Sequence, residues 1–291
     1  MIDHLIVVGV GLIGGSLALD LKQQGLVKHV TGIGRSRDNL ETALQLGIID
    51  SIGDDLAGVA ATADLILLSA PVGAMPGLFR QLAPVISANC IVTDVGSTKQ
   101  DVIAAARAGL GERSAQFVPG HPIAGAETNG AAAARSGLYA DKQFILTPLP
   151  ENSASDIERV ESLWRACGAR VARMDAILHD QIFAAVSHLP HLLAFAVMDE
   201  LASRPLVDMY FRYAGAGLRD ATRIAGSHPE MWRDITLANR DALLEELDAL
   251  GEKLKSLRAL VAAKDGVGLE HVFSRARQAR ADWLQGKYNN D

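Results

Sequence analysis

The sequence predicts an α/β domain with a doubly wound parallel sheet, followed by an all-α domain. Short β-branched runs alternate with helical stretches up to about residue 174, and a glycine-rich turn follows the first of these runs. Apolar strands joined by helices are typical of a parallel sheet that is covered on both faces. After Met174 the strand signal stops, so we place the two domains at residues 1–174 and 175–291.

Length and composition agree with two globular domains and exclude several classes of protein. The chain has 291 residues and a net charge of −6, which argues against a nucleic-acid binder because such a protein needs a basic face. Its two cysteines, Cys90 and Cys167, have no metal-ligand spacing, so we expect neither a disulfide framework nor a zinc site. Apolar runs of 18 or more uninterrupted residues do not occur, and we therefore expect a cytoplasmic protein without a membrane segment.

The strands and helices follow from local periodicity. The expected strands are residues 4–10, 29–33, 63–71, 90–95, 115–120, 143–148 and 169–174. Most are separated by Ala- and Leu-rich segments with helical spacing, which should form right-handed crossovers. Residues 175–203 and 228–285 are helical in period.

The first turn, GVGLIG at residues 9–14, fits the G-x-G-x-x-G fingerprint of a Rossmann-like domain. In such a turn the glycines permit a tight bend, close approach of a pyrophosphate and close helix–strand packing. A glycine-rich core turn is the alternative, but the position between a strand and a helix favours a dinucleotide site. The expected cofactor contacts are Gly9, Gly11, Leu12, Ile13 and Gly14, together with Ala70 and Pro71 after the third strand.

The residues that follow the second strand favour NADP over NAD. The fingerprint calls for an acidic residue about 20 positions further on, to bond the ribose hydroxyls. Gly34 stands there instead, followed by Arg35, Ser36 and Arg37. Two guanidinium groups and a hydroxyl suit a 2′-phosphate, which a carboxylate would repel. The alternative is that both arginines are solvated loop charges.

Two further candidates follow strands in the first half. Ser97 lies in DVGSTK at residues 94–99, beyond the carboxyl end of a strand, where open parallel sheets bind their ligands. Alternatively, Ser97 or Thr98 caps the helix that starts near Gln100. His121 lies in GHPIAGAE at residues 120–127, and we expect it at a strand end of the same sheet, which favours a catalytic role over a structural one.

Two more candidate motifs lie in the helical half. In SHLPH at residues 187–191, Pro190 should kink the helix, and His188 and His191 share a face. No third ligand has clear spacing, so we expect no metal there. In the second motif Arg219 and Arg223 are four residues apart, either on a solvated helix face or as a clamp for a carboxylate; their spacing favours neither.

A seam of apolar residues marks the C-terminal part of the chain. It consists of Leu243, Leu247, Leu250, Leu254, Leu257 and Val261, with the period of 3.5 that suits helix packing. It is short for a coiled coil between chains, so its spacing alone favours a helix in the core of its own domain.

Together these motifs resemble the prephenate/arogenate dehydrogenase family of tyrosine biosynthesis. The resemblance is carried by GVGLIGGS (9–16), DVGSTK (94–99), GHPIAGAE (120–127), SHLPH (187–191) and RDATRIAGSHPEMWRDI (219–235), in that order. It implies an N-terminal nucleotide-binding domain and a C-terminal helical dimerisation domain. The leucine seam would then meet a partner chain in a homodimer.

The resemblance implies an oxidative decarboxylation, with hydride transfer to NADP or NAD. Prephenate would give 4-hydroxyphenylpyruvate; arogenate, which would give tyrosine, is the alternative substrate, and an enzyme that accepts both is possible. His121 would accept the proton of the ring hydroxyl, Ser97 would hold that hydroxyl, and Arg223 would bind a carboxylate. The other substrate-binding candidates are His191, Ser187, His188, Glu127, Asp220 and Trp232.

Some residues depart from the family pattern, and two other functions compete with this reading. NAD-using members commonly carry the acid that Gly34 replaces, and the glycine stretch before the RD motif reads Gly215-Ala216-Gly217. A β-hydroxyacid dehydrogenase or imine reductase would share the layout, but the former is expected to use a catalytic lysine. A nucleotide-binding sensor would bind cofactor without turnover.

Overall fold

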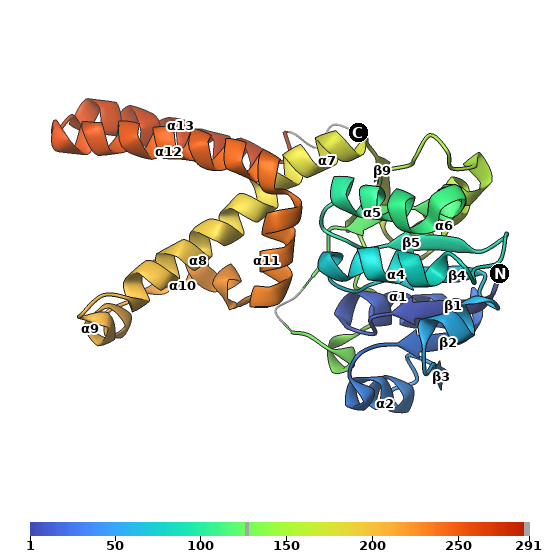
Figure 1. Ribbon diagram of the computed structural model, residues 1–291. Helices are drawn as coiled ribbons and strands as arrows, with labels where there is room; N and C mark the ends of the chain where they lie inside the picture. Colours follow the sequence, from blue (N-terminus) through green and yellow to red (C-terminus); the bar gives the residue numbers. More distant parts are fainter. Residues whose placement is uncertain (126–127, 288–291) are drawn as a thin grey trace. The chain divides into compact units, whose positions relative to one another are not determined.

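The computed structural model describes residues 1–125 and 128–287, which divide into two compact units at Leu243. The first unit contains a six-stranded sheet with the order β3-β2-β1-β4-β5-β6, in which all neighbouring strands are parallel (Figure 1). Its strands are β1 (Ile2–Val8), β2 (Val27–Ile33), β3 (Ser51–Ile52), β4 (Leu65–Leu68), β5 (Ile91–Asp94) and β6 (Phe117–Val118). The predicted doubly wound sheet is confirmed.

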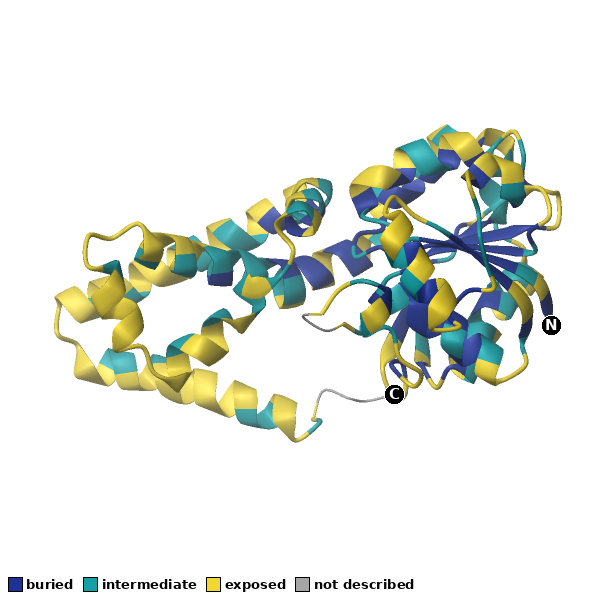
Figure 2. Cartoon of the chain, turned by 90° about the horizontal axis from the view of Figure 1, so that it is seen from below, coloured by how far each residue is buried: buried dark blue, intermediate teal, exposed yellow. Residues whose placement is uncertain are grey.

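Helices cover both faces of this sheet. They are α1 (Leu12–Gln23), α2 (Arg37–Gln45), α3 (Leu56–Ala60), α4 (Met75–Leu82) and α5 (Gln100–Leu110), with 3₁₀ turns η1 (Val72–Ala74), η2 (Gly111–Gln116) and η3 (Ala131–Ala133). Alternate residues of β1 enter two different cores: Val7 packs in the cluster that contains Leu17 of α1, and Ile6 in the cluster that contains Phe79 of α4. The central strands β4 and β5 are therefore buried along their whole length (Figure 2).

The expected strand regions 143–148 and 169–174 form a second sheet together with a strand that begins where the region 115–120 ends, which corrects the prediction of a single sheet. Strand β7 (Gly120–Pro122) runs antiparallel to β8 (Gln143–Leu146), and β8 runs parallel to β9 (Arg170–Arg173). Helix α6 (Ala154–Ala166) connects β8 to β9. His121 therefore lies inside β7, opposite Ile145, rather than at a strand end of the main sheet. Apolar periodicity identifies a strand but carries no information on which sheet it joins.

The helical region has a π-helical turn just before Pro190, where the sequence predicts a kink, although residues 176–202 stay continuously helical. It consists of α7 (Ala176–Phe183), a π-helical turn η4 (Ala184–His188), α8 (Leu189–Ala202), α9 (Val207–Arg212), α10 (Ala216–Thr222), the 3₁₀ turn η5 (Arg223–Gly226) and α11 (Pro229–Ala238). Pro190 lies in the first turn of α8, where its missing N–H costs least. The π turn before it supplies the irregular backbone on which Ser187 and His188 lie.

The combined helical stretch Ala176–Ala202 is long and apolar enough to cross a membrane by length and composition alone, with a mean hydropathy of 1.5. Of its most apolar window 22% is buried within the chain. One such stretch is weak evidence for a membrane span, because a helix that packs against another chain has the same composition.

The second unit consists of most of α12 (Arg240–Ala262) and of α13 (Gly266–Leu284). The side chain of Asp265 caps α13 by accepting a hydrogen bond from the Gly268 N–H. Within the seam, Leu254 is 55% exposed and Val261 is 63% exposed. The interpretation of the seam as a core helix of its own chain is therefore wrong for these two residues, whereas Leu243 at the start of the seam is 1% exposed.

The glycines of the first turn provide a test of the fold. Gly9 has a φ of +91°, and a Cβ added there would lie 2.4 Å from the Ser69 carbonyl oxygen, whereas a Cβ at Gly11 would meet no atom within 4 Å. We expect Gly9→Ala to lower the free energy of unfolding by about 1–3 kcal/mol. Gly11→Ala is the matched control and should lower it by under about 0.5 kcal/mol. Urea unfolding of both variants without cofactor, at one protein concentration, would contradict this if the losses were equal.

Candidate active site

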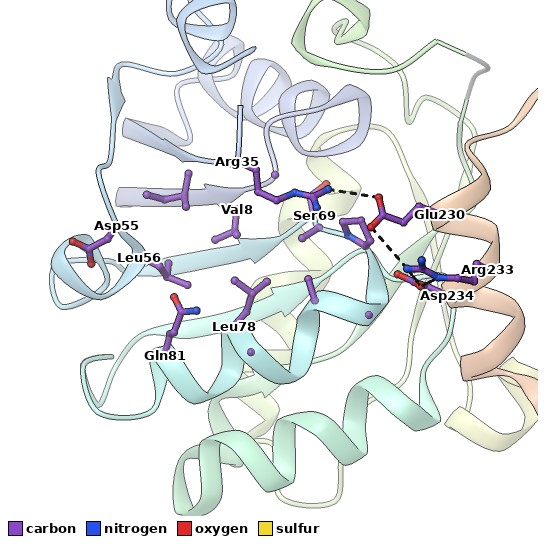
Figure 3. A pocket seen from close by; sticks show the side chains of 18 residues that line it. Val8, Arg35, Asp55, Leu56, Ser69, Leu78, Gln81, Glu230, Arg233 and Asp234 are labelled. Carbon is purple, nitrogen blue, oxygen red and sulfur yellow. Dashed lines mark hydrogen bonds and ion pairs between the residues drawn. The ribbon is translucent and has the colours of Figure 1, made fainter. Parts of the chain in front are cut away.

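A cavity of about 680 Å³ opens beyond the carboxyl ends of β1, β2 and β4 (Figure 3). This is the point where the strand order reverses, at which doubly wound sheets bind their ligands. Four of the expected cofactor contacts line this cavity: Gly9, Arg35, Ala70 and Pro71.

The remaining expected contacts do not line the cavity. Gly11, Leu12, Ile13 and Gly14 form the first turn of α1 beside it. The Gly14 N–H donates to the Ser69 hydroxyl, and a Cβ at Gly14 would lie 2.7 Å from Val7, so this glycine serves helix–strand packing. The Ser36 hydroxyl caps α2 by accepting from the Asn39 N–H, and Arg37 pairs with Glu41.

Sequence reasoning missed the contribution of α11 to this cavity. Glu230, Arg233 and Asp234 line it from the opposite side, and Figure 3 shows Arg35 and Arg233 pointing toward the Glu230 carboxylate. The Arg35–Glu230 distance is 4.0 Å, and Arg233 lies 2.6 Å from Asp234. These residues belong to the motif at residues 219–235, but its local pattern does not place them at this cavity, which they reach through tertiary packing of α11 on η1.

A buried ion pair stands at the end of β5. The Lys99 ammonium lies 2.5 Å from an Asp94 carboxylate oxygen, and neither side chain is exposed. Asp94 also accepts hydrogen bonds from the backbone N–H groups of Gly96 and Gly120, and Lys99 donates to the Gly120 carbonyl. The pair therefore ties the Gly96–Ser97 loop of the first sheet to β7 of the second.

His121 begins a chain of three buried titratable side chains. Its Nδ1 lies 2.9 Å from Nε2 of His179, and Nδ1 of His179 lies 2.8 Å from an Asp180 carboxylate oxygen. His121 also packs edge-on against Phe183. Burial, together with the nearby charges of His179 and Lys99, holds the pKa of His121 well below its ordinary value. The imidazole is therefore neutral at pH 7.

Asp180 caps helix α5, a role that the sequence analysis assigned to Ser97 or Thr98. Its carboxylate accepts hydrogen bonds from the backbone N–H groups of Lys99 and Gln100, at 2.8 and 2.9 Å. Burial opposes its ionisation, but His179 and these two N–H groups hold its pKa below the ordinary value. Local spacing suggested a cap from the same loop; the actual cap comes from a residue 80 positions further along the chain.

The two histidines of the SHLPH motif differ in burial and in hydrogen-bond partners. His188 is buried, and its Nδ1 accepts from the Asn239 side chain, which also donates to the Asp180 carbonyl. His191 is half-buried, donates from Nδ1 to the Ser187 carbonyl and stacks on Trp232 with 3.6 Å between ring centroids. Burial lowers the pKa of His191 and outweighs the hydrogen bond to Ser187, and the charge of Arg223 lowers it further.

The remaining expected substrate contacts surround this group. Arg223 follows α10 at the start of η5, close enough to His191 to affect its pKa. Asp220 lies on α10 and is exposed, while Glu127 lies outside the described residues. Across residues 1–125 and 128–287, no group of three or more His, Cys, Asp and Glu side chains is arranged to hold a metal ion.

Comparisons with known proteins settle the family. Residues 17–173 match the nucleotide-binding domain of prephenate dehydrogenase, and residues 175–275 match its dimerization domain. The chain belongs to the prephenate dehydrogenase family. Its members are oxidoreductases with a nucleotide-binding domain, so the predicted family and enzyme class are confirmed.

Individual relatives of the family span nearly the whole chain. A prephenate dehydrogenase of Bacillus subtilis is 35% identical, over 96% of this chain and 76% of that protein, and a cyclohexadienyl dehydrogenase of Zymomonas mobilis is 36% identical, over 95% and 94%. The crystal structure of prephenate dehydrogenase from Aquifex aeolicus with hydroxyphenyl propionate and NAD⁺ is 34% identical and has a TM-score of 0.90, with 97% and 98% of the chains covered.

The pH dependence of stability provides a test of the site. Burial lowers the pKa of His188 to about 4, and the charge of Asp180 offsets this only in part. Below pH 6.5 the unfolded chain binds a proton that the folded chain takes up only near pH 4, so stability falls as the pH drops through this window. His188 should contribute about 3 kcal/mol to that loss.

Between pH 6.5 and 4 we expect His188→Asn to lower the slope of the free energy of unfolding against pH. The decrease should correspond to about one fewer proton taken up on unfolding. Urea unfolding at several pH values measures this slope for both proteins. Equal slopes would show that His188 titrates alike in the folded and unfolded states.

Proposed function

We propose that this enzyme oxidatively decarboxylates prephenate to 4-hydroxyphenylpyruvate in tyrosine biosynthesis. The observation that carries the proposal is His121, a neutral, buried imidazole next to the Asp94–Lys99 pair, in a chain of the prephenate dehydrogenase family. A neutral imidazole can accept the proton of the substrate's ring hydroxyl while hydride leaves the carbon that carries this hydroxyl.

The chemistry requires one base and fixed cations. When bound, the nicotinamide supplies the hydride acceptor. His121 takes the hydroxyl proton, and the oxygen's electron pair forms the ring carbonyl. The bond to the ring carboxylate then breaks, carbon dioxide leaves, and its electrons return through the ring to the oxygen as the ring becomes aromatic. The phenolate oxygen takes the proton back from His121, so the histidine ends as it began.

The other site residues are proposed to bind and orient the substrate. Ser97, in the loop held by Asp94, would hold the same hydroxyl as His121. Arg223 would bind a substrate carboxylate, next to His191 and the stacked Trp232. Ser187, His188, Asp220 and Glu127 complete the proposed substrate contacts. A fixed arrangement of this kind lowers the entropic cost of reaching the reactive geometry.

For the cofactor we propose NADP ahead of NAD, on the strength of Arg35. It is the arginine of the 35–37 segment that lines the cavity, and its side chain is 84% exposed, so its guanidinium can turn from Glu230 toward a 2′-phosphate. NAD is the alternative, since the Aquifex aeolicus relative is described with NAD⁺. Arogenate is the alternative substrate, since an arogenate dehydrogenase of Synechocystis is 28% identical with a TM-score of 0.79.

We further propose a cytoplasmic homodimer that forms through the C-terminal helices, with the domain boundary after residue 174. The match of residues 175–275 to a dimerization domain supports the homodimer. So do the exposed apolar side chains of the region, among them Leu254, Val261 and Phe273. A partner chain would cover these residues and much of the apolar stretch Ala176–Ala202.

Initial rates with two substrates and two cofactors test the assignment. We expect prephenate with NADP to give the highest kcat/KM. Arg35→Ala should lower the NADP-to-NAD ratio of kcat/KM by about 10- to 100-fold, because a charged hydrogen bond to phosphate is lost. Arg37→Ala is the matched control and should change the ratio by under about threefold. Faster turnover with NAD would overturn the cofactor proposal, and turnover of arogenate alone would overturn the substrate.

Replacing the proposed base tests the mechanism. His121→Asn should lower kcat by about 10²- to 10⁴-fold, the contribution of a positioned general base, with the cofactor Kd nearly unchanged. Steady-state rates and cofactor titration by fluorescence measure both quantities. A variant that keeps full kcat would remove His121 from the reaction.

A further inference from the structure

We propose that His179 and Asp180 are positioning residues that fix His121 in the neutral tautomer with its proton on Nδ1 and a free Nε2. This inference rests on the proposed function, in which Nε2 of His121 accepts the substrate proton. Neither residue belongs to the motifs that identify the candidate site in the sequence.

The direction of the hydrogen bonds follows from the anchor at Asp180. Its carboxylate accepts from two backbone N–H groups at the start of α5, so it is ionised and can act only as an acceptor. Nδ1 of His179 must therefore carry the proton that it shares with Asp180 at 2.8 Å. When His179 is neutral, its Nε2 holds a lone pair.

The contact with His179 also fixes where His121 carries its proton. Because Nε2 of His179 holds a lone pair, the 2.9 Å contact requires Nδ1 of His121 to be the donor. The neutral ring then holds its one basic lone pair on Nε2, which has no hydrogen-bond partner among the residues that the structure describes. An isolated imidazole can place its proton on either nitrogen, whereas this chain selects the tautomer that makes Nε2 a base.

The burial of the chain suggests that it does more than cap a helix. His179 and Asp180 are 0% and 1% exposed, and each polar atom buried there requires a partner to repay its lost hydration. The two backbone N–H groups alone would satisfy a cap, and the contact of residue 179 with Phe183 does not require a polar side chain. The imidazole at 179 is the group that links the anchored carboxylate to His121.

Two substitutions of His179 distinguish its proposed role, as the hydrogen-bond acceptor for His121, from a role in packing alone. Asparagine can still donate to Asp180 from the place of Nδ1 but offers no acceptor to His121, whereas the longer glutamine can place its Oε1 where Nε2 stood. We expect His179→Asn to lower kcat by about 10²-fold, with the KM for prephenate and the cofactor Kd within about threefold. His179→Gln should retain kcat within about tenfold of the unmodified enzyme.

The effect should disappear when the base itself is absent. In the background of His121→Asn, adding His179→Asn should lower kcat by less than about twofold, because the tautomer of residue 121 no longer matters. An equal loss of kcat in both backgrounds, or equal activities of the Asn and Gln variants, would show a purely structural role and overturn the proposal.

Histidine-selective ¹⁵N NMR of the unsubstituted holoenzyme tests the tautomer even if the His179 variants fail to fold. We expect a pyrrole-type Nδ1 and a pyridine-type Nε2 for His121, assigned by their loss in His121→Asn. The opposite pattern overturns the proposal. Failure of the proposed function is distinguishable, since the unmodified enzyme would then not turn over prephenate with either cofactor.

Discussion

The candidate site depends on the buried ion pair between Asp94 and Lys99. Two charges without exposure to water are stable only if their remaining hydrogen-bonding groups are satisfied, and here Gly96 and Gly120 satisfy them. The pair therefore allows one arrangement of the loop that carries Ser97 and of the strand that carries His121. The Lys99 N–H in turn binds Asp180, which brings α7 into the same group.

The burial that makes this arrangement rigid also sets its chemistry. It lowers the pKa values of His121, His179, His188 and His191, so that the site holds neutral imidazoles at pH 7. Neutral rings can accept protons, and they can be held in one tautomer by their neighbours. Lys99, which is paired, and Arg223 carry positive charge close to these rings, and an anionic substrate would benefit from the charge of Arg223.

The sequence predicted what depends on local pattern. The parallel sheet, the glycine turn at Gly9 and the family follow from periodicity and motifs, and the structure and the comparisons confirm them. It could not predict which strands join the second sheet, nor that Asp180 rather than Ser97 caps α5. Both are decided by tertiary contacts between segments far apart in sequence. His179, and the place of Glu230 at the cofactor cavity, were missed for the same reason, although the adjacent His179-Asp180 pair inside an apolar helix was a visible signal.

The products of the unsubstituted enzyme test the central claim most directly. With prephenate and an oxidised nicotinamide cofactor, the account predicts one carbon dioxide and one 4-hydroxyphenylpyruvate for each cofactor that is reduced. Trapped carbon dioxide, product absorbance and cofactor absorbance measure the three quantities in one reaction. Reduced cofactor without carbon dioxide would contradict oxidative decarboxylation, and so would the absence of any reduction.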